Sequence, residues 1–325
     1  MDDALRVTGI GLVTRFAVGT GDVVRGLVAS GLGAGQLTAF EPEKFIEPQR
    51  LRRLDRLSVL GMVSARLAVA DAKLDLGRER PDETTGVAFG TGYGCQETAL
   101  RYVTKLVAEG AYFTNPIDFP DSIDGAPAAH IAMDLGLRGP SATHTDDVLS
   151  GEQALLHSVL AIRNGRAARL VVVAGDTMTS WRRRTEVRCR REQPDSAGEG
   201  AVALVVESGA SARERGVTGW ARLVGVGRAG PGAGGGGPHA ERVALGDAGF
   251  QAEQVVDWPL GPAPFPASGL LRVALLCTQL RDRAASRQPP VNNERGGCTP
   301  PRQPPVLYRA TAPRGGSIAL VLSDP

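Results

Sequence analysis

The segment Gly139-Pro-Ser-Ala-Thr-His-Thr-Asp-Asp-Val-Leu-Ser-Gly151 decides how this chain is organised. It has the composition of a loop and a short strand that lead into a helix, which we expect over 150–164. An apolar strand follows at 168–174. The order of strand, turn, helix and strand predicts a βαβ crossover, and therefore an α/β protein.

The rest of the chain shows the same alternation of short apolar segments with segments of helical spacing. At 325 residues it is long enough for two domains or for one large duplicated α/β unit. We expect further strands over 6–14, 85–90, 201–206, 221–226 and 317–322. We expect further helices over 22–30, 53–76, 97–109, 126–135, 240–248 and 270–280.

Charge and cysteine usage exclude several classes of protein. With 37 Lys+Arg against 35 Asp+Glu, the net charge of +2 favours neither a nucleic-acid partner nor a membrane surface. No apolar run approaches the roughly eighteen residues of a membrane span, and the acidic start Met1-Asp2-Asp3 is unlike a secretory signal, so we predict a cytoplasmic protein. The four cysteines form no CxxC pair, which argues against a metal site or a disulfide framework.

Several motifs are shared with one family. They include Arg6-Val-Thr-Gly-Ile-Gly-Leu-Val-Thr14, Gly90-Thr-Gly-Tyr-Gly94, Leu135-Gly-Leu-Arg-Gly-Pro-Ser141 and Gly198-Glu-Gly-Ala201. On these motifs the chain resembles the β-ketoacyl synthases, the condensing enzymes of the thiolase superfamily, almost continuously over residues 5–227. The resemblance implies a layered αβαβα fold of two related halves. Residues 1–227 would hold the first half and the start of the second, and 228–325 a shortened C-terminal half with flexible Gly/Pro-rich loops at 228–239 and 281–305.

The family's nucleophile is a cysteine at a strand-to-helix turn, where a helix N-terminus stabilises its thiolate. Counting inward from Gly139-Pro-Ser141 and from Ser150-Gly151 puts Val148 at the position of that cysteine. Valine has no nucleophilic atom. The two histidines that complete the family's site are also missing from the comparable stretches, 255–258 and 261–269. The resemblance therefore implies that this chain has no catalytic residue.

The turn Gly90-Thr-Gly-Tyr-Gly94 is a weak match to a nucleotide-binding loop, and we interpret it as a tight turn. In dimers of the family, the helix after this turn lies at the subunit interface and helps to wall the partner's acyl tunnel. Cys95, Thr98 and Tyr102 share one face of that helix here, and Phe119 follows in the next loop. Two interpretations of these four residues are open. They line an acyl tunnel at the subunit interface, or they are ordinary residues of the interface core.

Arginines form a cluster at 182–184 and 188–191, and another at 50–56. Acidic acyl carrier proteins dock on basic patches of condensing enzymes, so these clusters are candidates for that contact. A solvated loop is the simpler interpretation, because arginine is common throughout this chain.

A condensing-enzyme scaffold with an empty active site resembles the chain-length factor of bacterial type II polyketide synthases. The resemblance implies a heterodimer with a catalytic ketosynthase, whose acyl tunnel this subunit walls and whose product length it sets. The product would be a polyketide and, from the motifs around Gly90 and Asn115, a polyene. The acyl carrier protein, with its phosphopantetheine-bound chain, would contact mainly the partner. No cofactor or metal is expected.

Two other hypotheses remain open at this stage. The chain is an atypical acyltransferase of the same superfamily that uses Ser150, His144 or Asp147 in place of the cysteine, or it is a degenerate scaffold with no role in assembly.

Overall fold

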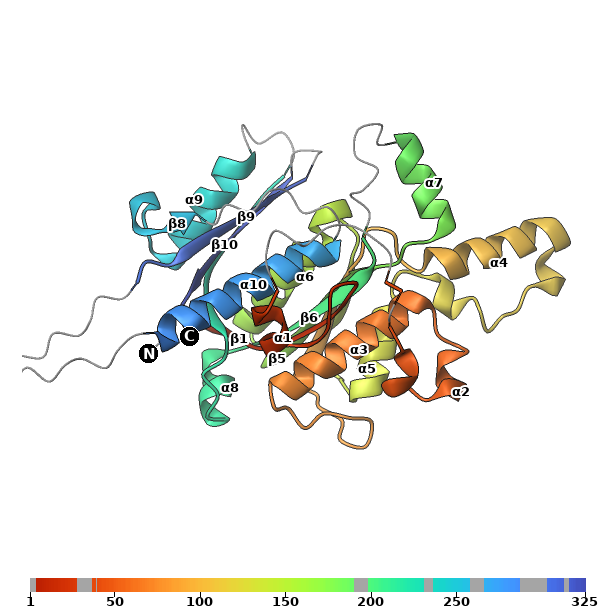
Figure 1. Cartoon of the computed structure of the whole chain (residues 1–325), viewed down its shortest axis with the longest axis horizontal. Coiled ribbons are helices and arrows are strands. Elements are labelled where there is room, and N and C mark those ends of the chain that lie inside the picture. The colour runs from red at the N-terminus through yellow and green to blue at the C-terminus, as the bar shows by residue number, and fades with distance from the viewer. Residues whose placement is uncertain are drawn as a thin grey trace, which may run out of the picture.

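A computed structural model of the chain describes residues 4–27, 37–38, 40–189, 198–230, 236–257, 266–286, 303–312 and 316–325. Within these ranges ten strands form one mixed sheet in the spatial order β4-β3-β5-β6-β1-β7-β10-β9-β8, and β2 pairs with β1 beside this path. The sheet has two parts, one from each half of the chain, with helices packed around both (Figure 1).

The first part of the sheet comes from β1 (Leu5–Thr14), β2 (Val18–Thr20), β3 (Thr85–Gly90), β4 (Ser141–His144), β5 (Arg169–Asp176) and β6 (Gly200–Glu207). β3 pairs in parallel with β4 and with β5, as the predicted crossover requires. β6 lies antiparallel between β5 and β1. β4 has only β3 beside it, so it forms one edge of the sheet within the part of the chain that the structure describes.

The second part comes from β7 (Ala221–Ala229), β8 (Val256–Asp257), β9 (Val306–Thr311) and β10 (Ser317–Ser323). β10 pairs antiparallel with β7 and with β9, and β8 is parallel to β9. The two parts are joined because the first three residues of β1, Leu5–Val7, also pair with Ala221–Leu223 of β7.

The helices make three layers around the two parts of the sheet (Figure 1). α3 (Arg56–Asp71) and α5 (Ala126–Leu135) cover the outer face of the first part. α6 (Ser150–Arg163) and α10 (Pro266–Ala285) lie between the two parts, where they share a core with residues of β1, β5, β7 and β9. α9 (Gly236–Ala248) packs on the outer face of the second part. The predicted αβαβα layering is confirmed.

Close packing of α3 on β1 depends on two glycines of the opening strand. A Cβ atom on Gly9 would lie 2.1 Å from the Ala68 carbonyl oxygen, and one on Gly11 would lie 2.2 Å from the Ser64 carbonyl oxygen. No side chain fits at either distance, so glycine allows the helix backbone to approach the strand.

The remaining helices are α1 (Gly21–Arg25), α2 (Pro48–Leu51), α4 (Gln96–Glu109), α7 (Ser180–Cys189) and α8 (Gly209–Glu214). Short 3-10 turns are η2 (Pro42–Lys44), η3 (Ala111–Phe113), η4 (Pro120–Ser122), η5 (Asp147–Leu149) and η7 (Ala252–Gln254). α3 is shorter than the predicted helix over 53–76. Asp55 caps its first turn by accepting a hydrogen bond from the Leu57 amide, and Lys73 leaves the helix with φ +55.

Two segments predicted to be flexible loops contain regular structure where they are described. Residues 228–229 end β7 and 236–239 begin α9, while 281–285 are the last turn of α10. Arg309 of β9 forms an ion pair with Glu241 of α9 at 3.0 Å, which ties the start of that helix to the sheet. Residues 230, 286 and 303–305 have no helix or strand, and residues 231–235 and 287–302 lie outside the described residues.

A search of the described helices finds none with both the length and the apolar character needed to cross a membrane.

Candidate functional site

Val148 lies in η5, where the parallel strands end and α6 begins. Its side chain is 6% exposed and belongs to the core between the two parts of the sheet. The preceding residue, Asp147, has φ +49, a left-handed conformation that costs a residue with a side chain about 1–3 kcal/mol. The sharp strand-to-helix turn is therefore present, and it carries a hydrocarbon side chain that cannot form a thioester.

Ser150, two residues further on, is completely buried at the first position of α6. Its hydroxyl accepts a hydrogen bond from the Asp146 amide at 2.8 Å and lies 2.9 Å and 2.7 Å from the carbonyl oxygens of Thr91 and Asp147. These contacts tie the turn to the end of β3. They give the hydroxyl a structural role, because its proton is shared with backbone carbonyls rather than drawn off by a base.

His144, the last residue of β4, packs against His157 of α6, with ring centroids 4.9 Å apart and ring planes tilted by 52°. Its Nε2 atom is buried and has no hydrogen-bond partner among the described residues. Burial, followed by the nearby His157 and Arg228, lowers the pKa of His144. The structure thus gives no support to an acyltransferase site in which His144 activates Ser150.

Asp176 ends β5 beside the Gly-rich turn Gly90–Gly94, and its carboxyl group is fully buried. It accepts hydrogen bonds from the Thr91 hydroxyl at 2.8 Å and from the amides of Gly92 and Tyr93 at 3.2 Å and 3.1 Å. Burial raises the pKa of Asp176, and the charge of Arg182 together with these hydrogen bonds opposes the rise. The Gly-rich turn is therefore anchored on an acidic side chain, as a tight turn rather than a phosphate loop.

Arg182, predicted to belong to an exposed basic cluster, is 1% exposed. It lies in α7, which occupies a stretch expected to be a loop. Arg183 and Arg184 are exposed, whereas the side chain of Arg188 and residues 190–191 lie outside what the structure describes. In the second cluster, Arg56 forms an ion pair with the buried Glu199 at 2.6 Å. Neither cluster is thus simply a solvated patch.

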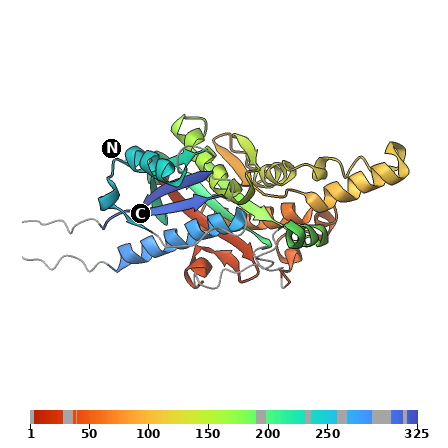
Figure 2. The same cartoon turned by 90° about the horizontal axis from the view of Figure 1, so that it is seen from above.

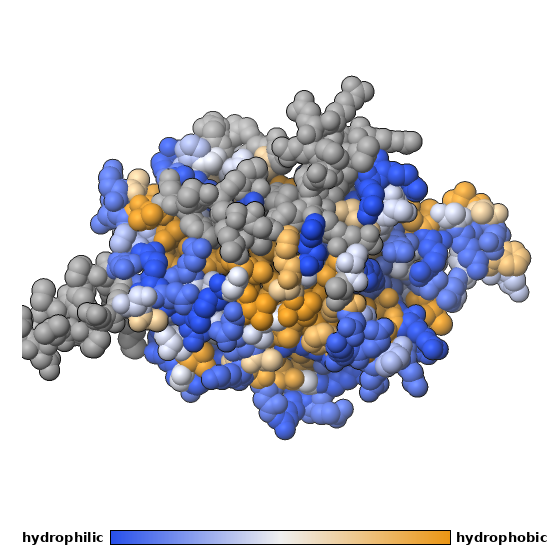
Figure 3. All heavy atoms as spheres, in the orientation of Figure 1, coloured by the Kyte–Doolittle hydropathy of each residue, from blue (hydrophilic) through white to orange (hydrophobic). Residues whose placement is uncertain are grey.

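Residues 96–125, which include α4, η3 and η4, form a projection that we call the arm. α4 runs outward from the body of the molecule in both views (Figures 1 and 2). The outer part of the arm exposes large apolar side chains, with Val107 81% and Tyr112 93% accessible. Other exposed apolar residues of the arm are Val103, Leu106, Phe113, Ile117, Phe119 and Ile123. Figure 3 shows apolar residues at the end of this projection.

The four residues predicted for a tunnel wall occupy two different environments at the arm. Cys95 and Thr98 are 1% and 4% exposed, so they face the interior of this chain. Burial, with the negative charges of Asp55 and Asp124 next, raises the pKa of the Cys95 thiol and keeps it protonated. Tyr102 and Phe119 form an aromatic pair with centroids 5.7 Å apart, and Phe119 is 54% exposed. Of the four residues, only Phe119 is exposed, and Tyr102 is half-buried.

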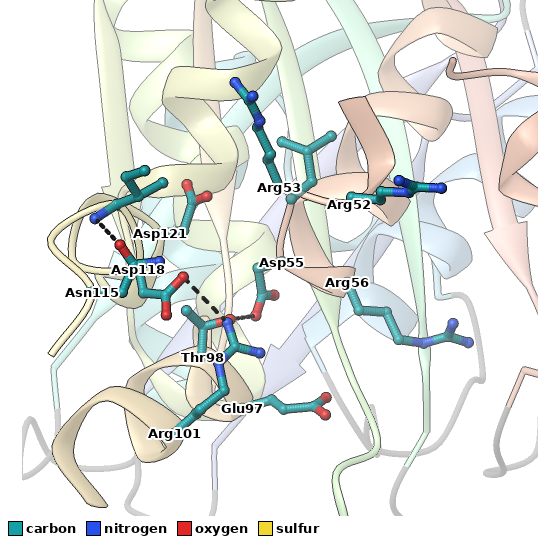
Figure 4. A pocket seen from close by; sticks show the side chains of 12 residues that line it. Arg52, Arg53, Asp55, Arg56, Glu97, Thr98, Arg101, Asn115, Asp118 and Asp121 are labelled. Atoms are coloured by element: carbon teal, nitrogen blue, oxygen red, sulfur yellow. Dashed lines mark hydrogen bonds and ion pairs between the residues drawn. The ribbon is translucent and has the colours of Figure 1, made fainter. Parts of the chain in front are cut away.

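A pocket of about 500 Å³ separates the arm from the residues before α3 (Figure 4). Arg52, Arg53 and Arg56 line one side. Acidic residues from the arm, Glu97, Asp118 and Asp121, line the other. At the bottom of the pocket the Thr98 hydroxyl donates a hydrogen bond to Asp55 at 2.7 Å, which links α4 to the cap of α3.

Thr98→Val is expected to lower the free energy of unfolding by about 1–3 kcal/mol, because the buried Asp55 carboxylate loses one of its hydrogen-bond donors. Chemical denaturation measures the effect. The matched control is Thr104→Val, at an exposed position of the same helix, and it should change the stability by less than about 0.5 kcal/mol. Equal effects of the two substitutions would contradict the role given to the Thr98 hydroxyl.

Sequence reasoning missed Glu152, which lies one turn into α6 and is completely buried. Its carboxylate accepts a hydrogen bond from the hydroxyl of Tyr308 in β9 at 2.7 Å. The available signal was a charged residue placed four positions after Val148, on the apolar face of a helix expected to be buried. Among the described residues, no three His, Cys, Asp or Glu side chains come together as a possible metal site.

Comparisons with known proteins agree with this architecture. Residues 21–191 match the family model described as "Beta-ketoacyl synthase, N-terminal domain". A 3-oxoacyl-[acyl-carrier-protein] synthase 2 from Staphylococcus aureus is 30% identical in an alignment of 248 positions that covers 68% of this chain and 61% of that protein. The chain thus spans about 60% of the length of the curated relatives that it matches.

Solved structures have the same thiolase-like fold. The ishigamide ketosynthase/chain length factor matches with a TM-score of 0.78 at 18% identity, over 98% of this chain and 99% of that one. A complex of a type II polyketide acyl-carrier protein with its ketosynthase, bound to the hexaketide, matches with a TM-score of 0.73 at 18% identity, over 99% of this chain and 100% of that one.

Proposed function

Because this chain belongs to the β-ketoacyl synthase family, we propose that it is a non-catalytic subunit, similar to a chain-length factor, that pairs with a catalytic ketosynthase. The observation that carries the proposal is Val148, a hydrocarbon side chain on the strand-to-helix turn where the family holds its cysteine. The buried, backbone-bound Ser150 supplies no replacement nucleophile. The partner would perform the condensation, and this chain would shape the space into which the product grows.

The arm and the edge strand β4 are the surfaces proposed for pairing. The arm carries exposed aliphatic and aromatic side chains, which are typical of the apolar centre of an obligate interface. β4 leaves one side of its backbone unpaired in the described part of the sheet, and a strand from another subunit can bind there. A ketosynthase partner of the same fold, related by a pseudo-two-fold axis, would cover both surfaces.

Tyr102 and Phe119 are proposed as the residues of this chain that limit the acyl chain. Their rings pack against each other and Phe119 is exposed, so the pair can stand at the end of a tunnel that the partner completes. Cys95 and Thr98 would support the wall from behind, because both are buried within this chain. The product would be a polyketide, and we propose a polyene. The acyl carrier protein would deliver its phosphopantetheine-bound chain mainly to the partner, in the cytoplasm and without a cofactor.

The pairing experiment is co-expression of the chain with candidate ketosynthases, followed by isolation of a stoichiometric complex. Val107→Asp is expected to weaken the complex at least about 100-fold, because it buries an unpaired carboxylate in an apolar interface. Val243→Asp, at an exposed position of α9, is the matched control and should leave the affinity unchanged. A complex that tolerates Val107→Asp would contradict the proposed interface.

Intact-mass analysis of the working complex distinguishes the alternatives. We expect the acyl adduct on the partner and none on this chain, and we expect Tyr102→Ala or Phe119→Ala to change product length. An adduct on this chain would favour an atypical acyltransferase instead. A chain that neither pairs nor changes the products would be a scaffold without a role in assembly.

A further inference from the structure

We propose that Arg182 is a positioning residue that fixes the direction of the arm and so presents its apolar surface to the partner subunit. The effect of Arg182 on pairing rests on the proposed function. Its effect on the direction of the arm involves residues of this chain alone. Arg182 lies outside the arm, in α7, and acts on it through Asp176 and Tyr93.

The Arg182 side chain is the largest of those that are almost fully buried in the described part of the chain. Its guanidinium group donates hydrogen bonds to the carbonyl oxygens of Thr177 and Gly198, at 2.8 Å and 3.2 Å. It also lies over the ring of Tyr93, with its central carbon 4.3 Å from the ring centroid. One side chain therefore joins the end of β5, the approach to β6 and the Gly-rich turn.

That turn is the base of the arm. Asp176 accepts hydrogen bonds from the amides of Gly92 and Tyr93, and α4 begins three residues after Tyr93. A buried carboxylate holds such a geometry only if its charge is compensated, and the positive charge of Arg182 stabilises the ionised form of Asp176. The direction in which the chain leaves the turn is thus set by hydrogen bonds to the buried Asp176 side chain, next to the positive charge of Arg182.

The outer part of α4 makes little contact with the body of the molecule. From Arg101 to the end of α4, every residue except Tyr102 is exposed. The arm contacts the body near its two ends, through the Thr98–Asp55 hydrogen bond in the first turn of α4 and through Asp121, whose Oδ1 atom lies 2.6 Å from Nε2 of His130 in α5. A small change in the backbone direction at residues 92–95 rotates the whole of α4. It therefore displaces the apolar surface near Val107 much more than the first turn of the helix.

Lysine is a poor substitute for this arginine. The planar guanidinium stacks on Tyr93 while it donates to two carbonyl oxygens in fixed directions, and an ammonium group supplies the charge without that geometry. Arg182→Lys is therefore expected to preserve folding and yet to loosen the arm.

Hydrogen exchange on the isolated chain, read by mass spectrometry, tests the inference. We expect Arg182→Lys to speed exchange in α4 about threefold or more, and β1 and β6 to be unaffected. The double variant Arg182→Met/Asp176→Asn removes both buried ionisable groups, so it is expected to fold and to speed exchange in α4 about tenfold. Arg183→Met, at the exposed neighbouring position, is the matched control and should leave α4 unchanged. Unchanged exchange in α4 in the double variant, or an equal increase in β1 and β6, would overturn the proposal.

Affinity for the ketosynthase partner supplies the second measurement. The double variant is expected to raise the dissociation constant about tenfold at a temperature where it is fully folded, and Arg183→Met to leave it unchanged. If the wild-type chain binds no ketosynthase, the proposed function fails, and the exchange data still decide whether Arg182 positions the arm. Wild-type affinity in a double variant with a loosened arm would overturn the link between arm direction and pairing.

Discussion

Glu152→Gln is expected to raise the free energy of unfolding by about 3 kcal/mol at pH 9 and to change it very little at pH 4. Burial raises the pKa of Glu152 from 4.5 to about 7, although the hydrogen bond from Tyr308 and the charge of Arg272 act in the opposite direction. The glutamine has nearly the same size and is neutral throughout this range. It therefore removes the cost of ionising a buried carboxyl group.

The wild type loses stability relative to Glu152→Gln as pH rises because its folded and unfolded states bind different numbers of protons. Between the unfolded pKa of 4.5 and the folded pKa of about 7, the folded protein holds a proton on Glu152 that the unfolded chain has lost. The stability of the wild type therefore decreases as pH rises through this window and changes no further, through this group, above it. The pKa values of Asp71 and Asp176 are also raised by burial, and their effect cancels between wild type and variant.

The measurement is a series of denaturant titrations of both proteins from pH 4 to pH 9. Tyr308→Phe is the companion variant. It removes the donor 2.7 Å from the carboxylate, so it should make the loss of stability with pH larger than in the wild type. Parallel pH profiles for wild type and Glu152→Gln would show that Glu152 does not titrate in this window.

The central crossover could be predicted from the sequence because each of its parts has a strong local signal. The glycines of the opening strand, the apolar residues of β5 and the polar residues that open α6 all specify their own conformation. The layered architecture was predicted from the family resemblance and is confirmed by the two helices between the parts of the sheet. Secondary structure in this region depends mainly on residues close in sequence.

The surroundings of Val148 and of the Gly-rich turn depend on residues far apart in sequence, and local patterns do not reveal them. Arg182 stands in a run of three arginines and has the composition of a surface residue, yet it is buried against Tyr93, 89 positions earlier. Glu152 accepts a hydrogen bond from Tyr308, a residue 156 positions later. A periodic pattern shows which face of a helix is apolar, but it does not show which charged residue finds a partner there.

The arm illustrates the same limit for the predicted site. Helical spacing predicts one shared face for Cys95, Thr98 and Tyr102, but it gives no direction for that face. The structure turns Cys95 and Thr98 towards Asp55 and leaves the outer part of α4 exposed. Whether a face of an amphipathic helix is buried in its own chain or in a partner depends on the angle of the preceding turn, which a single sequence does not encode in its periodicity.

Trp220→Ala is expected to lower the free energy of unfolding by about 3–5 kcal/mol, because removal of a large, buried aromatic side chain leaves a cavity. Trp220 is 3% exposed, and its indole N–H donates to the Asp71 carboxylate at 2.7 Å. The guanidinium groups of Arg281 and Arg25 lie over its ring, with their central carbons 4.2 Å and 5.7 Å from the centroid. These contacts join α10 and α1 to the start of β7 at the place where the two parts of the sheet meet.

Two variants separate the contributions of this side chain. Trp220→Phe keeps an aromatic ring under the arginines but removes the indole N–H, so it should cost about 1–3 kcal/mol through the hydrogen bond lost by Asp71. Trp181→Ala, at a side chain that is 39% exposed, controls for the loss of any tryptophan and should cost much less than Trp220→Ala. Denaturation followed by circular dichroism measures all three, since removing a tryptophan changes the fluorescence signal itself. Equal costs for Trp220→Ala and Trp181→Ala would mean that Trp220 does not hold α10 and the two parts of the sheet together.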